Sequence, residues 1–285
     1  MAAAPPPLLP PPIVDVAWLR ASDDVVVCDV RNYLDGRVGR DAHEAGHLPG
    51  AVHVDLETAL SSRPGPIVGR HPLPTPEDFA AALVDLGIGD DVTVVAYDDA
   101  GGMIAGRLVW MLRRIGQPAS LLDGGVAAWI DDGGALETGP VEPRVGATRD
   151  VVPWPAERFV DADAVATHVA DGGVVVDSRA PERFRGEVEP IDSKAGHVPG
   201  AINLPFPANL DGPLDRGQLL PDDEVRERFV DAGVDGDAIV YCGSGVSACQ
   251  NLLAIEQVGL GIARLYVGSW SGWSSDPDRA VATGN

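Results

Sequence analysis

Cys242 stands where the sequence most strongly suggests chemistry. It follows the apolar run 239–241 ("IVY") and precedes "GSGVS", after which a helical pattern begins at about Ala248. Backbone N–H groups and the N-terminus of a helix stabilise an anion, and a stabilised thiolate is a nucleophile. Gly243 and Gly245 let the backbone curl around such an anion, because glycine adopts positive φ without a steric penalty. The sequence therefore predicts a nucleophilic thiolate on a strand-to-helix loop.

The other two cysteines lack this setting. Cys28 lies inside "VVVCDV" and Cys249 lies within the expected helix, and free cysteines are among the most often buried residues. We expect both to belong to the core. The three cysteines form no disulfide framework and no Cys/His cluster with zinc spacing, so neither a metal nor another cofactor is expected. A reducing, cytoplasmic location fits this pattern best.

The elements that must position Cys242 belong to an internal repeat. Four blocks of the first half return in the second half in the same order, which indicates two homologous halves. The paired blocks are Val25–Arg31 with Val174–Arg179, Glu44–Leu56 with Lys194–Phe206, Ile88–Asp99 with Val234–Gly243, and Leu121–Trp129 with Leu265–Trp273. His47 and His197 occur in both copies of the second block. We therefore expect them to have a structural role in a turn.

Each half is expected to be a small α/β domain. Short runs rich in valine and isoleucine alternate with segments of helical period such as "PEDFAAALVDLG" and "SACQNLLAIEQVG". Strands that are apolar on both faces and separated by helices indicate a parallel sheet with helices on both faces. We expect a flexible N-terminal lead-in over 1–12, a first domain over 13–140, a linker over 141–157 and a second domain over 158–285.

The composition excludes several classes of partner. The 285 residues carry a formal net charge of −22, and this field repels nucleic acids and anionic membranes. No run of apolar residues is long enough to span a bilayer. An anionic substrate is still compatible with the sequence, provided that local cations or N–H groups bind it.

These motifs together resemble the two-domain rhodanese-type sulfurtransferases. The resemblance rests on the tandem halves, "AGHxPGA" in each half, "DSRAPERFRGE", and the loop "CGSGV" with "YVGSWSGW" after it, and it extends from about Ile13 to Gly284. It implies tandem rhodanese-like domains in which Cys242 carries a sulfur atom as a persulfide. In the first half, Asp98 occupies the position that is equivalent to that of Cys242 in the repeat. An aspartate cannot carry sulfane sulfur. The resemblance therefore implies a non-catalytic first domain.

The resemblance also implies a proton relay beside the cysteine. Ser244 in the loop, His71 in "GRHPLP" and Glu57 in "VDLET" match a serine, histidine and acid of the family. The acid of the family is more often aspartate. Asp55 is therefore an alternative to Glu57.

Donor binding is implied for a further set of residues. Arg183 in "ERFRG" matches a substrate-binding arginine, whose planar fork of donors suits a carboxylate. A second family arginine is replaced by Ile191, and Lys194 or Arg185 is expected to substitute for it. The loop residues expected to complete the donor site are Gly243, Gly245, Val246 and Ser247.

The loop sequence favours one donor. "CGSGVS" contains no cation and resembles the mercaptopyruvate branch of the family, whereas thiosulfate-specific members have basic residues in this loop. We therefore expect 3-mercaptopyruvate as the donor, and cyanide or a thiol, such as a small thiol or a thioredoxin-like protein, as the acceptor. The alternatives are a thiosulfate:cyanide sulfurtransferase and a non-catalytic binding module. A phosphatase is excluded because Ala248 stands where that class needs an arginine.

Overall fold

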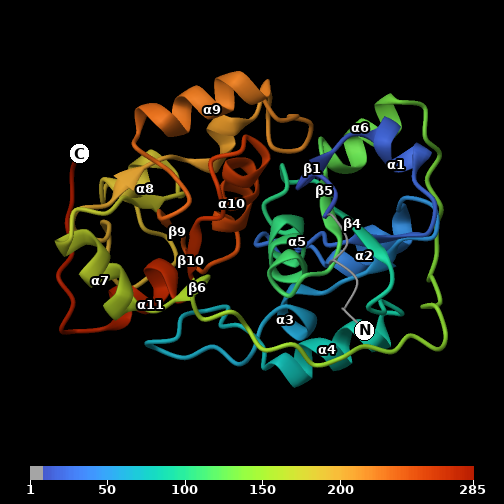
Figure 1. Cartoon of the computed structure of the whole chain (residues 1–285), viewed down its shortest axis with the longest axis horizontal. Helices are drawn as coiled ribbons and strands as arrows, with labels where there is room; N and C mark the ends of the chain where they lie inside the picture. The colour runs from blue at the N-terminus through green and yellow to red at the C-terminus, as the bar shows by residue number, and fades with distance from the viewer. Residues whose placement is uncertain (1–8) are drawn as a thin grey trace, which may run out of the picture.

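The computed structural model describes residues 9–285 and contains one five-stranded parallel sheet in each half (Figure 1). The strand orders are β1-β5-β4-β2-β3 and β6-β10-β9-β7-β8. The strands are β1 (Ile13–Val14), β2 (Val25–Asp29), β3 (Val52–His53), β4 (Thr93–Tyr97), β5 (Ala119–Leu122), β6 (Phe159–Val160), β7 (Val175–Asp177), β8 (Ile202–Asn203), β9 (Ile239–Tyr241) and β10 (Arg264–Tyr266). Each strand of the first sheet has a counterpart at the same place in the second. The expected tandem α/β fold is confirmed.

Helices connect successive strands in both halves. Those of the first half are α1 (Val16–Ala21), α2 (Gly39–Ala45), α3 (Leu56–Ala59), α4 (Pro76–Asp85), α5 (Ala105–Arg114) and α6 (Gly125–Asp131). Those of the second half are α7 (Ala162–Ala170), α8 (Pro181–Phe184), the 3-10 helix η1 (Phe206–Asn209), α9 (Asp222–Asp231), α10 (Ala248–Gln257) and α11 (Ser269–Ser275). Parallel strands need crossover connections, and helices provide them here. The alternation of strands and helices predicted from the sequence therefore places the loops that follow the strands at the carboxyl ends of the sheet.

The repeated sequence blocks form the same buried clamp in both domains. Arg31 pairs with Asp29 at 2.5 Å and donates to the carbonyl oxygen of Gly46 at 2.7 Å. Arg179 pairs with Asp177 at 2.6 Å and donates to the carbonyl oxygen of Gly196 at 2.6 Å. A buried ion pair whose remaining donors are satisfied fixes geometry in a low-dielectric interior. The clamp therefore explains why the block around Arg31 recurs together with the "AGH" block.

The two histidines of the "AGH" blocks are also buried and bonded to the backbone. His47 Nδ1 lies 2.8 Å from the carbonyl oxygen of His43, and His197 Nδ1 lies 2.7 Å from that of Phe184. The backbone N–H of each histidine bonds to a residue near the end of its own domain. Both histidines therefore bond to backbone groups within a turn, as is typical of residues with a structural role.

Helices α5 and α10 lie side by side between the two sheets (Figure 1). Their backbones approach closely, since a Cβ on Gly106 would lie 3.3 Å from the backbone nitrogen of Gln250. Apolar residues of both halves join in one continuous core. Arg113 of α5 also pairs with Glu256 of α10 at 2.6 Å. The two domains are thus held together by apolar packing and by a partly buried ion pair.

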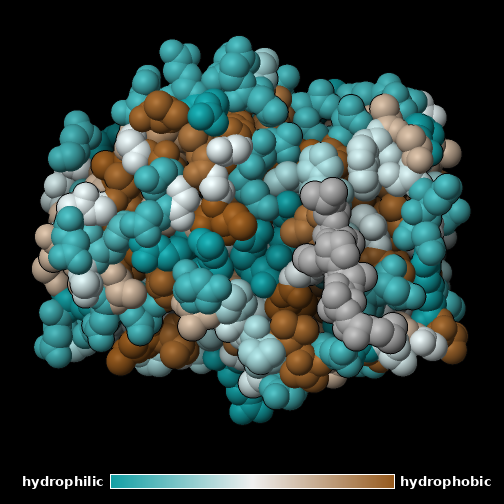
Figure 2. All heavy atoms as spheres, in the orientation of Figure 1, coloured by the Kyte–Doolittle hydropathy of each residue, from teal (hydrophilic) through white to brown (hydrophobic). Residues whose placement is uncertain are grey.

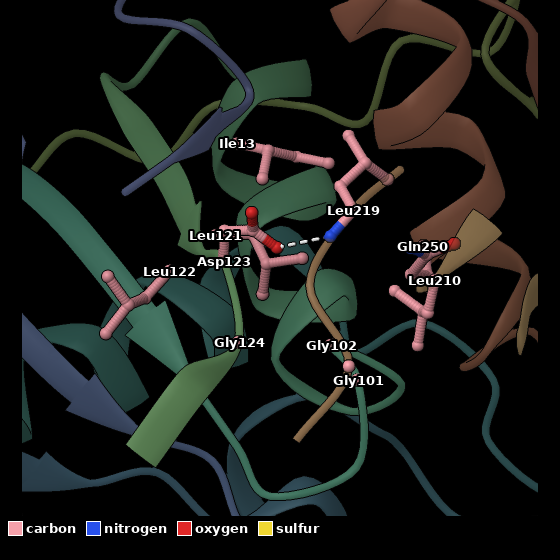
Figure 3. A pocket seen from close by; sticks show the side chains of 11 residues that line it. Ile13, Gly101, Gly102, Leu121, Leu122, Asp123, Gly124, Leu210, Leu219 and Gln250 are labelled. Atoms are coloured by element: carbon pink, nitrogen blue, oxygen red, sulfur yellow. Dashed lines mark hydrogen bonds between the residues drawn. The ribbon is translucent and has the colours of Figure 1, made fainter. Parts of the chain in front are cut away.

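A small pocket lies where the edge of the first sheet meets the 210–219 segment of the second domain (Figure 3). Ile13, Leu121 and Gly102 line it from one side, and Leu210 and Leu219 from the other. The Asp123 carboxylate crosses the interface and accepts a hydrogen bond from the Leu219 N–H at 2.8 Å. Asp123 is therefore an interdomain contact.

Residues 10–12 of the N-terminal segment form hydrogen bonds with the first domain. Carbonyl oxygens of Pro10, Pro11 and Pro12 accept hydrogen bonds from Arg113, Ser120 and Leu121. Residues 10–12 of the expected lead-in are thus bonded to the first domain, because their carbonyl groups continue the bonding of β1. The part of the lead-in at 1–8 lies outside the described residues.

The outer surface is mostly hydrophilic on the face shown in Figure 2, with apolar residues in scattered patches. Within residues 9–285 no helix is long and apolar enough to cross a bilayer.

Candidate active site

Cys242 directly follows β9 and is 1% exposed. Its backbone N–H donates to Ser269 Oγ at 3.2 Å, and its carbonyl oxygen accepts from the Trp270 N–H at 2.9 Å. The next carbonyl, of Gly243, accepts from the Ser271 N–H at 2.9 Å. Helix α11 thus holds the start of the loop from behind. The "GSWSGW" stretch that follows β10 supplies these contacts.

The loop then turns into α10. Gly245 has φ +75°, and a Cβ there would lie 2.7 Å from the carbonyl oxygen of Val267. The carbonyl oxygens of Val246 and Ser247 accept from the N–H groups of Cys249 and Gln250 and so begin the helix. Only glycine fits at position 245, because a side chain would be strained by φ and blocked by the neighbouring backbone.

The equivalent loop of the first domain, which follows β4, contains a buried aspartate. Asp98 follows β4 as Cys242 follows β9, and it is buried. Its carboxylate accepts four backbone N–H groups, from Ala100, Gly102, Ile104 and Ala105, at 2.8–2.9 Å. Burial raises the pKa of Asp98, and the four donors act against that rise. The loop after the fourth strand of the repeat is therefore built to surround an acceptor group with N–H donors.

Ser244, His71 and Glu57 lie in hydrogen-bonding contact. His71 Nδ1 is 2.8 Å from Ser244 Oγ, and His71 Nε2 is 2.9 Å from Glu57 Oε1. Burial lowers the pKa of His71, whereas its contact with Glu57 raises it; the net shift is downward. An imidazole between a hydroxyl and a carboxylate can move a proton between them. The three side chains come from both domains, because Glu57 lies in α3 of the first domain and Ser244 lies in the loop of Cys242.

Asp55 has a different task from Glu57. Its Oδ1 accepts the backbone N–H groups of Glu57 and Thr58, at 3.0 and 2.9 Å, as the N-cap of α3. An N-cap carboxylate satisfies the unpaired donors at the start of a helix. Of the two candidate acids, Glu57 is the one in contact with His71.

Two guanidinium groups lie over Gly243. The three heavy atoms nearest to where a Cβ on Gly243 would stand belong to Arg70 Nη2, at 3.0 Å, and to Arg183 Nη1 and Nη2, at 3.6 and 3.9 Å. Arg183 was expected near the loop from the sequence, and Arg70 was not. Arg70 comes from the first domain and directly precedes His71 in the chain.

The expected substitutes for the second family arginine are engaged elsewhere. Lys194 Nζ donates to the carbonyl oxygen of Asp276 at 3.0 Å, and Arg185 forms an exposed pair with Glu187 at 2.8 Å. Ile191 is exposed. The second guanidinium beside Gly243 therefore belongs to Arg70 rather than to Lys194 or Arg185. The sequence offered one signal for it, namely that Arg70 adjoins a candidate relay residue.

Carboxylates already contact both guanidiniums. Asp192 pairs with Arg70 and, at 3.2 Å, with Arg183. Glu189 pairs with Arg183 at 2.6 Å. Burial raises the pKa of Asp192. Burial also acts to raise that of Glu189, but hydrogen bonds from Arg183 and two backbone N–H groups lower it overall. Asp192 thus bridges two cations of different domains beside the cysteine loop.

The remaining cysteines are fully buried. Burial raises the pKa of Cys28 and of Cys249, so both thiols stay protonated at neutral pH. Among residues 9–285 there is no cluster of three or more His, Cys, Asp and Glu side chains that could hold a metal ion.

Comparisons with known proteins agree with the repeat and the fold. The family described as Rhodanese-like domain matches residues 15–132 and 161–276. A Pseudomonas aeruginosa protein named probable 3-mercaptopyruvate sulfurtransferase is 42% identical over 273 residues, which cover 92% of this chain and 93% of that protein. A Mycobacterium tuberculosis protein that is provisionally named a thiosulfate sulfurtransferase is also 42% identical, over 93% of each chain.

A solved structure has the same two-domain arrangement. The crystal structure of SseA from Escherichia coli, a 3-mercaptopyruvate sulfotransferase with the "Rhodanese" fold, superposes on this chain with a TM-score of 0.74 and 33% sequence identity. The match covers 91% of this chain and 99% of that one. Sequence, repeat and architecture therefore agree over nearly the whole length, and the chain belongs to the two-domain rhodanese family of sulfurtransferases.

Proposed function

We propose that this chain moves a sulfur atom from 3-mercaptopyruvate, through a persulfide on Cys242, to a thiophilic acceptor. The observation that carries the proposal is the placement of Arg70 and Arg183 over Gly243, one residue beyond the cysteine. Two guanidiniums suit the carboxylate of an α-keto acid. The names of the P. aeruginosa and E. coli relatives support the same donor.

The first step is an attack on sulfur. The Cys242 thiolate forms an S–S bond with the thiol sulfur of the donor while the C–S bond of the donor breaks. The electron pair of that bond goes to carbon and leaves the enolate of pyruvate. A proton on carbon completes pyruvate, and Cys242 holds the persulfide. The two electrons released as the S–S bond forms are accepted by the donor carbon, so the step needs no external oxidant.

Ser244 and His71 are proposed to supply the proton. Ser244 is two residues from Cys242, and its Oγ is backed by His71 and Glu57. A positioned acid contributes typically about 10²–10⁴-fold to a step in which a carbanion is quenched. The relay is therefore assigned to release of the enolate rather than to sulfur capture.

The donor carboxylate is proposed to displace Asp192 from the two guanidiniums. Asp192 bridges Arg70 and Arg183 in the free protein, so these cations are oriented before the donor arrives. An oriented, charge-assisted pair loses less rotamer entropy on binding than a free side chain does. The backbone beneath the donor is proposed to be that of the loop residues Gly243, Gly245, Val246 and Ser247.

Thiosulfate is the second candidate donor, and the name of the M. tuberculosis relative favours it. Thiosulfate concentrates its charge beside the transferred sulfur and so needs a cation inside the loop. The loop from Cys242 to Ala248 contains none. In mercaptopyruvate the carboxylate lies two carbons from the sulfur, a separation that Arg70 and Arg183 can bridge.

The acceptor is proposed to be cyanide or a thiol, the latter as a small molecule or on a thioredoxin-like protein. In that step the acceptor bonds to the outer sulfur, and the S–S electron pair returns to Cys242 as thiolate. The three free cysteines of the described residues support a reducing, cytoplasmic compartment. The net charge of −22 argues against a nucleic acid or an anionic membrane as partner.

A donor comparison tests the proposal. We expect a higher kcat/KM with 3-mercaptopyruvate than with thiosulfate. Arg183→Ala and Arg70→Ala should each lower the former by about tenfold or more, since losing a charged partner of the substrate costs about 2–5 kcal/mol. Arg185→Ala is the matched control, because Arg185 pairs with Glu187 on the surface and should leave the rate unchanged. A faster reaction with thiosulfate would contradict the donor assignment.

A further inference from the structure

Arg70 is held beside the cysteine loop through its backbone as well as through its side chain. Its N–H donates to Ser271 Oγ at 3.1 Å, and the Ser271 N–H donates to the carbonyl oxygen of Gly243 at 2.9 Å. The Arg70 guanidinium in turn lies 3.0 Å from where a Cβ on Gly243 would stand. Ser271 of α11 therefore bonds both to the loop of Cys242 and to the backbone of the cation that lies over this loop.

Arg70 directly follows a short hairpin of the first domain, residues 65–69, which we call the interdomain hairpin. Gly65 and Gly69 exchange backbone hydrogen bonds at 3.1 and 3.0 Å. The hairpin belongs to the loop between α3 and α4, which extends toward α11 (Figure 1). Ser275 Oγ donates to the carbonyl oxygen of Pro66. With Ser271 and Ser275, α11 therefore bonds to both sides of the interdomain hairpin.

The hairpin and α11 approach so closely that glycine is needed on both. A Cβ on Gly272 would lie 2.6 Å from the carbonyl oxygen of Ile67, and a Cβ on Gly69 would lie 2.6 Å from that of Gly268. Gly272 is inside α11, where glycine is less favourable than alanine by about 1 kcal/mol. The residue that weakens the helix is thus also the residue that lets the hairpin lie on it.

The internal repeat gives an independent comparison. The second domain has an equivalent hairpin, which is closed by Leu219 and lies against the first domain. Leu220 follows this hairpin, in the position that Arg70 has after the interdomain hairpin. Of the two hairpins, the one beside the loop of Cys242 therefore carries the cation.

Arg70 is also open to a ligand. Its side chain is 31% exposed. Together with Asp192 and Ser271 it lines a hollow of about 360 Å³ between the interdomain hairpin and the 191–193 segment. An anion in this hollow is within reach of Arg70, whereas Cys242 itself is 1% exposed. The position of the Arg70 backbone therefore decides where the carboxylate of such an anion is held.

We propose that Ser271 is a positioning residue for donor recognition: with Gly272 it seats the interdomain hairpin on α11 and so holds Arg70 where it binds the donor carboxylate. The inference rests on the proposed function, in that Arg70 binds an anion beside Cys242, but not on which sulfur donor carries the charge. Arg183 is oriented within its own domain by Glu189. Loss of Ser271 should therefore weaken the contribution of one cation and leave the other.

Alkylation of Cys242 by two reagents measures the placement of Arg70 without a sulfur donor. Iodoacetate carries a carboxylate and iodoacetamide is neutral, so the ratio of their rates on the Cys242 peptide reports the attraction of a carboxylate and cancels any change in thiolate fraction. Arg70→Ala should lower this ratio by about fivefold or more. Ser271→Ala removes the acceptor of the Arg70 N–H and should lower it by about threefold or more, with the iodoacetamide rate unchanged.

Gly272→Ala tests the seat of the hairpin. Alanine stabilises a helix relative to glycine, so a role confined to α11 predicts no loss of the ratio. Displacement of the hairpin predicts a fall at least as large as that in Ser271→Ala. Ser274→Ala is the matched control, because Ser274 is buried on the same helix and its hydroxyl has no hydrogen-bond partner among residues 9–285. It should leave the ratio unchanged.

Turnover and a double variant complete the test. Ser271→Ala should raise KM for 3-mercaptopyruvate by about threefold or more and leave kcat nearly unchanged, because it weakens binding and not the chemical step. Ser271→Ala combined with Arg70→Ala should give the ratio of Arg70→Ala alone, since both changes act through one guanidinium.

The proposal is overturned if Ser271→Ala or Gly272→Ala keeps the wild-type ratio, if the effects of Ser271→Ala and Arg70→Ala multiply in the double variant, or if Ser274→Ala lowers the ratio equally. An unchanged ratio in Arg70→Ala would overturn the role of Arg70 and this inference with it. A faster reaction with thiosulfate than with 3-mercaptopyruvate would contradict the proposed donor and leave these ratios unaffected.

Discussion

At the scale of single residues, the site combines side chains that are far apart in the chain. Cys242 could be identified from its own surroundings, because two glycines and a helix start follow a buried strand. The contact of His71 with Ser244 spans 173 positions, and no local pattern encodes such a distance; only the family resemblance paired them. Arg70 was missed for the same reason. Lys194 and Arg185 were chosen because they are near Ile191 in sequence, but each has a partner away from the loop.

Replacing Ser244 tests the relay. Ser244→Ala removes the hydroxyl that His71 contacts, and we expect kcat with 3-mercaptopyruvate to fall about 10²-fold or more because the enolate loses its acid. Turnover of thiosulfate should change far less, since sulfite leaves without needing a proton on carbon. Steady-state rates with both donors check this. An equal loss with both donors would show that Ser244 acts on Cys242 rather than on the leaving group.

At the scale of elements, the strand, loop and helix around Cys242 were predictable in order and approximate position. The alternation of apolar runs and helical patterns indicated β9 and α10, and the repeat located their counterparts β4 and α5. The support from α11 was not predictable, since the bond from the Cys242 N–H to Ser269 Oγ depends on how α11 packs behind the loop. Segment order follows from local pattern, whereas contacts between segments follow from packing.

The conformation of Gly245 gives a prediction at this scale. Gly245→Ala should abolish sulfur transfer and lower the free energy of unfolding, because a Cβ would meet the Val267 carbonyl oxygen at 2.7 Å and φ is +75°. Strained backbone alone costs about 1–3 kcal/mol. Gly36→Ala is the control: φ there is +93° with no atom within 4 Å of a Cβ. Urea unfolding should show a smaller loss for Gly36→Ala, with sulfur transfer intact. Equal effects of the two variants would contradict the account.

At the scale of the whole molecule, the proposed active site is formed where the two domains pack together. The second domain supplies Cys242, Ser244 and Arg183, and the first supplies His71 and Arg70. The repeat in the sequence predicted two similar domains, but it could not show that α5 packs against α10 or that Asp123 bonds to Leu219 across the interface. Such placements depend on the summed fit of two apolar surfaces.

Asp123 makes the interface sensitive to pH. Burial raises its pKa from 3.8 to about 6, although the bond from the Leu219 N–H opposes the rise. The folded protein therefore binds a proton on Asp123 that the unfolded chain has released between about pH 4 and pH 6, so this group's contribution to stability is lost as pH rises through that window.

Asp123→Asn keeps the acceptor for Leu219 without the charge. We expect it to exceed the wild type in free energy of unfolding by about 1–3 kcal/mol at pH 7.5 and by much less at pH 4.5, since one pKa unit corresponds to about 1.4 kcal/mol. Urea titrations at the two pH values measure this. An advantage that is equal at both pH values, or absent at pH 7.5, would show that the carboxylate is not strained by burial.

The most direct test of the central claim is the intact mass of the protein after treatment with 3-mercaptopyruvate and removal of small molecules. The wild type should gain one sulfur atom and lose it again to cyanide, with the gain located on the Cys242 peptide. Cys28→Ser and Cys249→Ser should gain it as the wild type does, because both thiols are buried and protonated. Cys242→Ser should gain none. A gain of sulfur by Cys242→Ser, or the absence of this gain in Cys28→Ser or Cys249→Ser, would contradict the account.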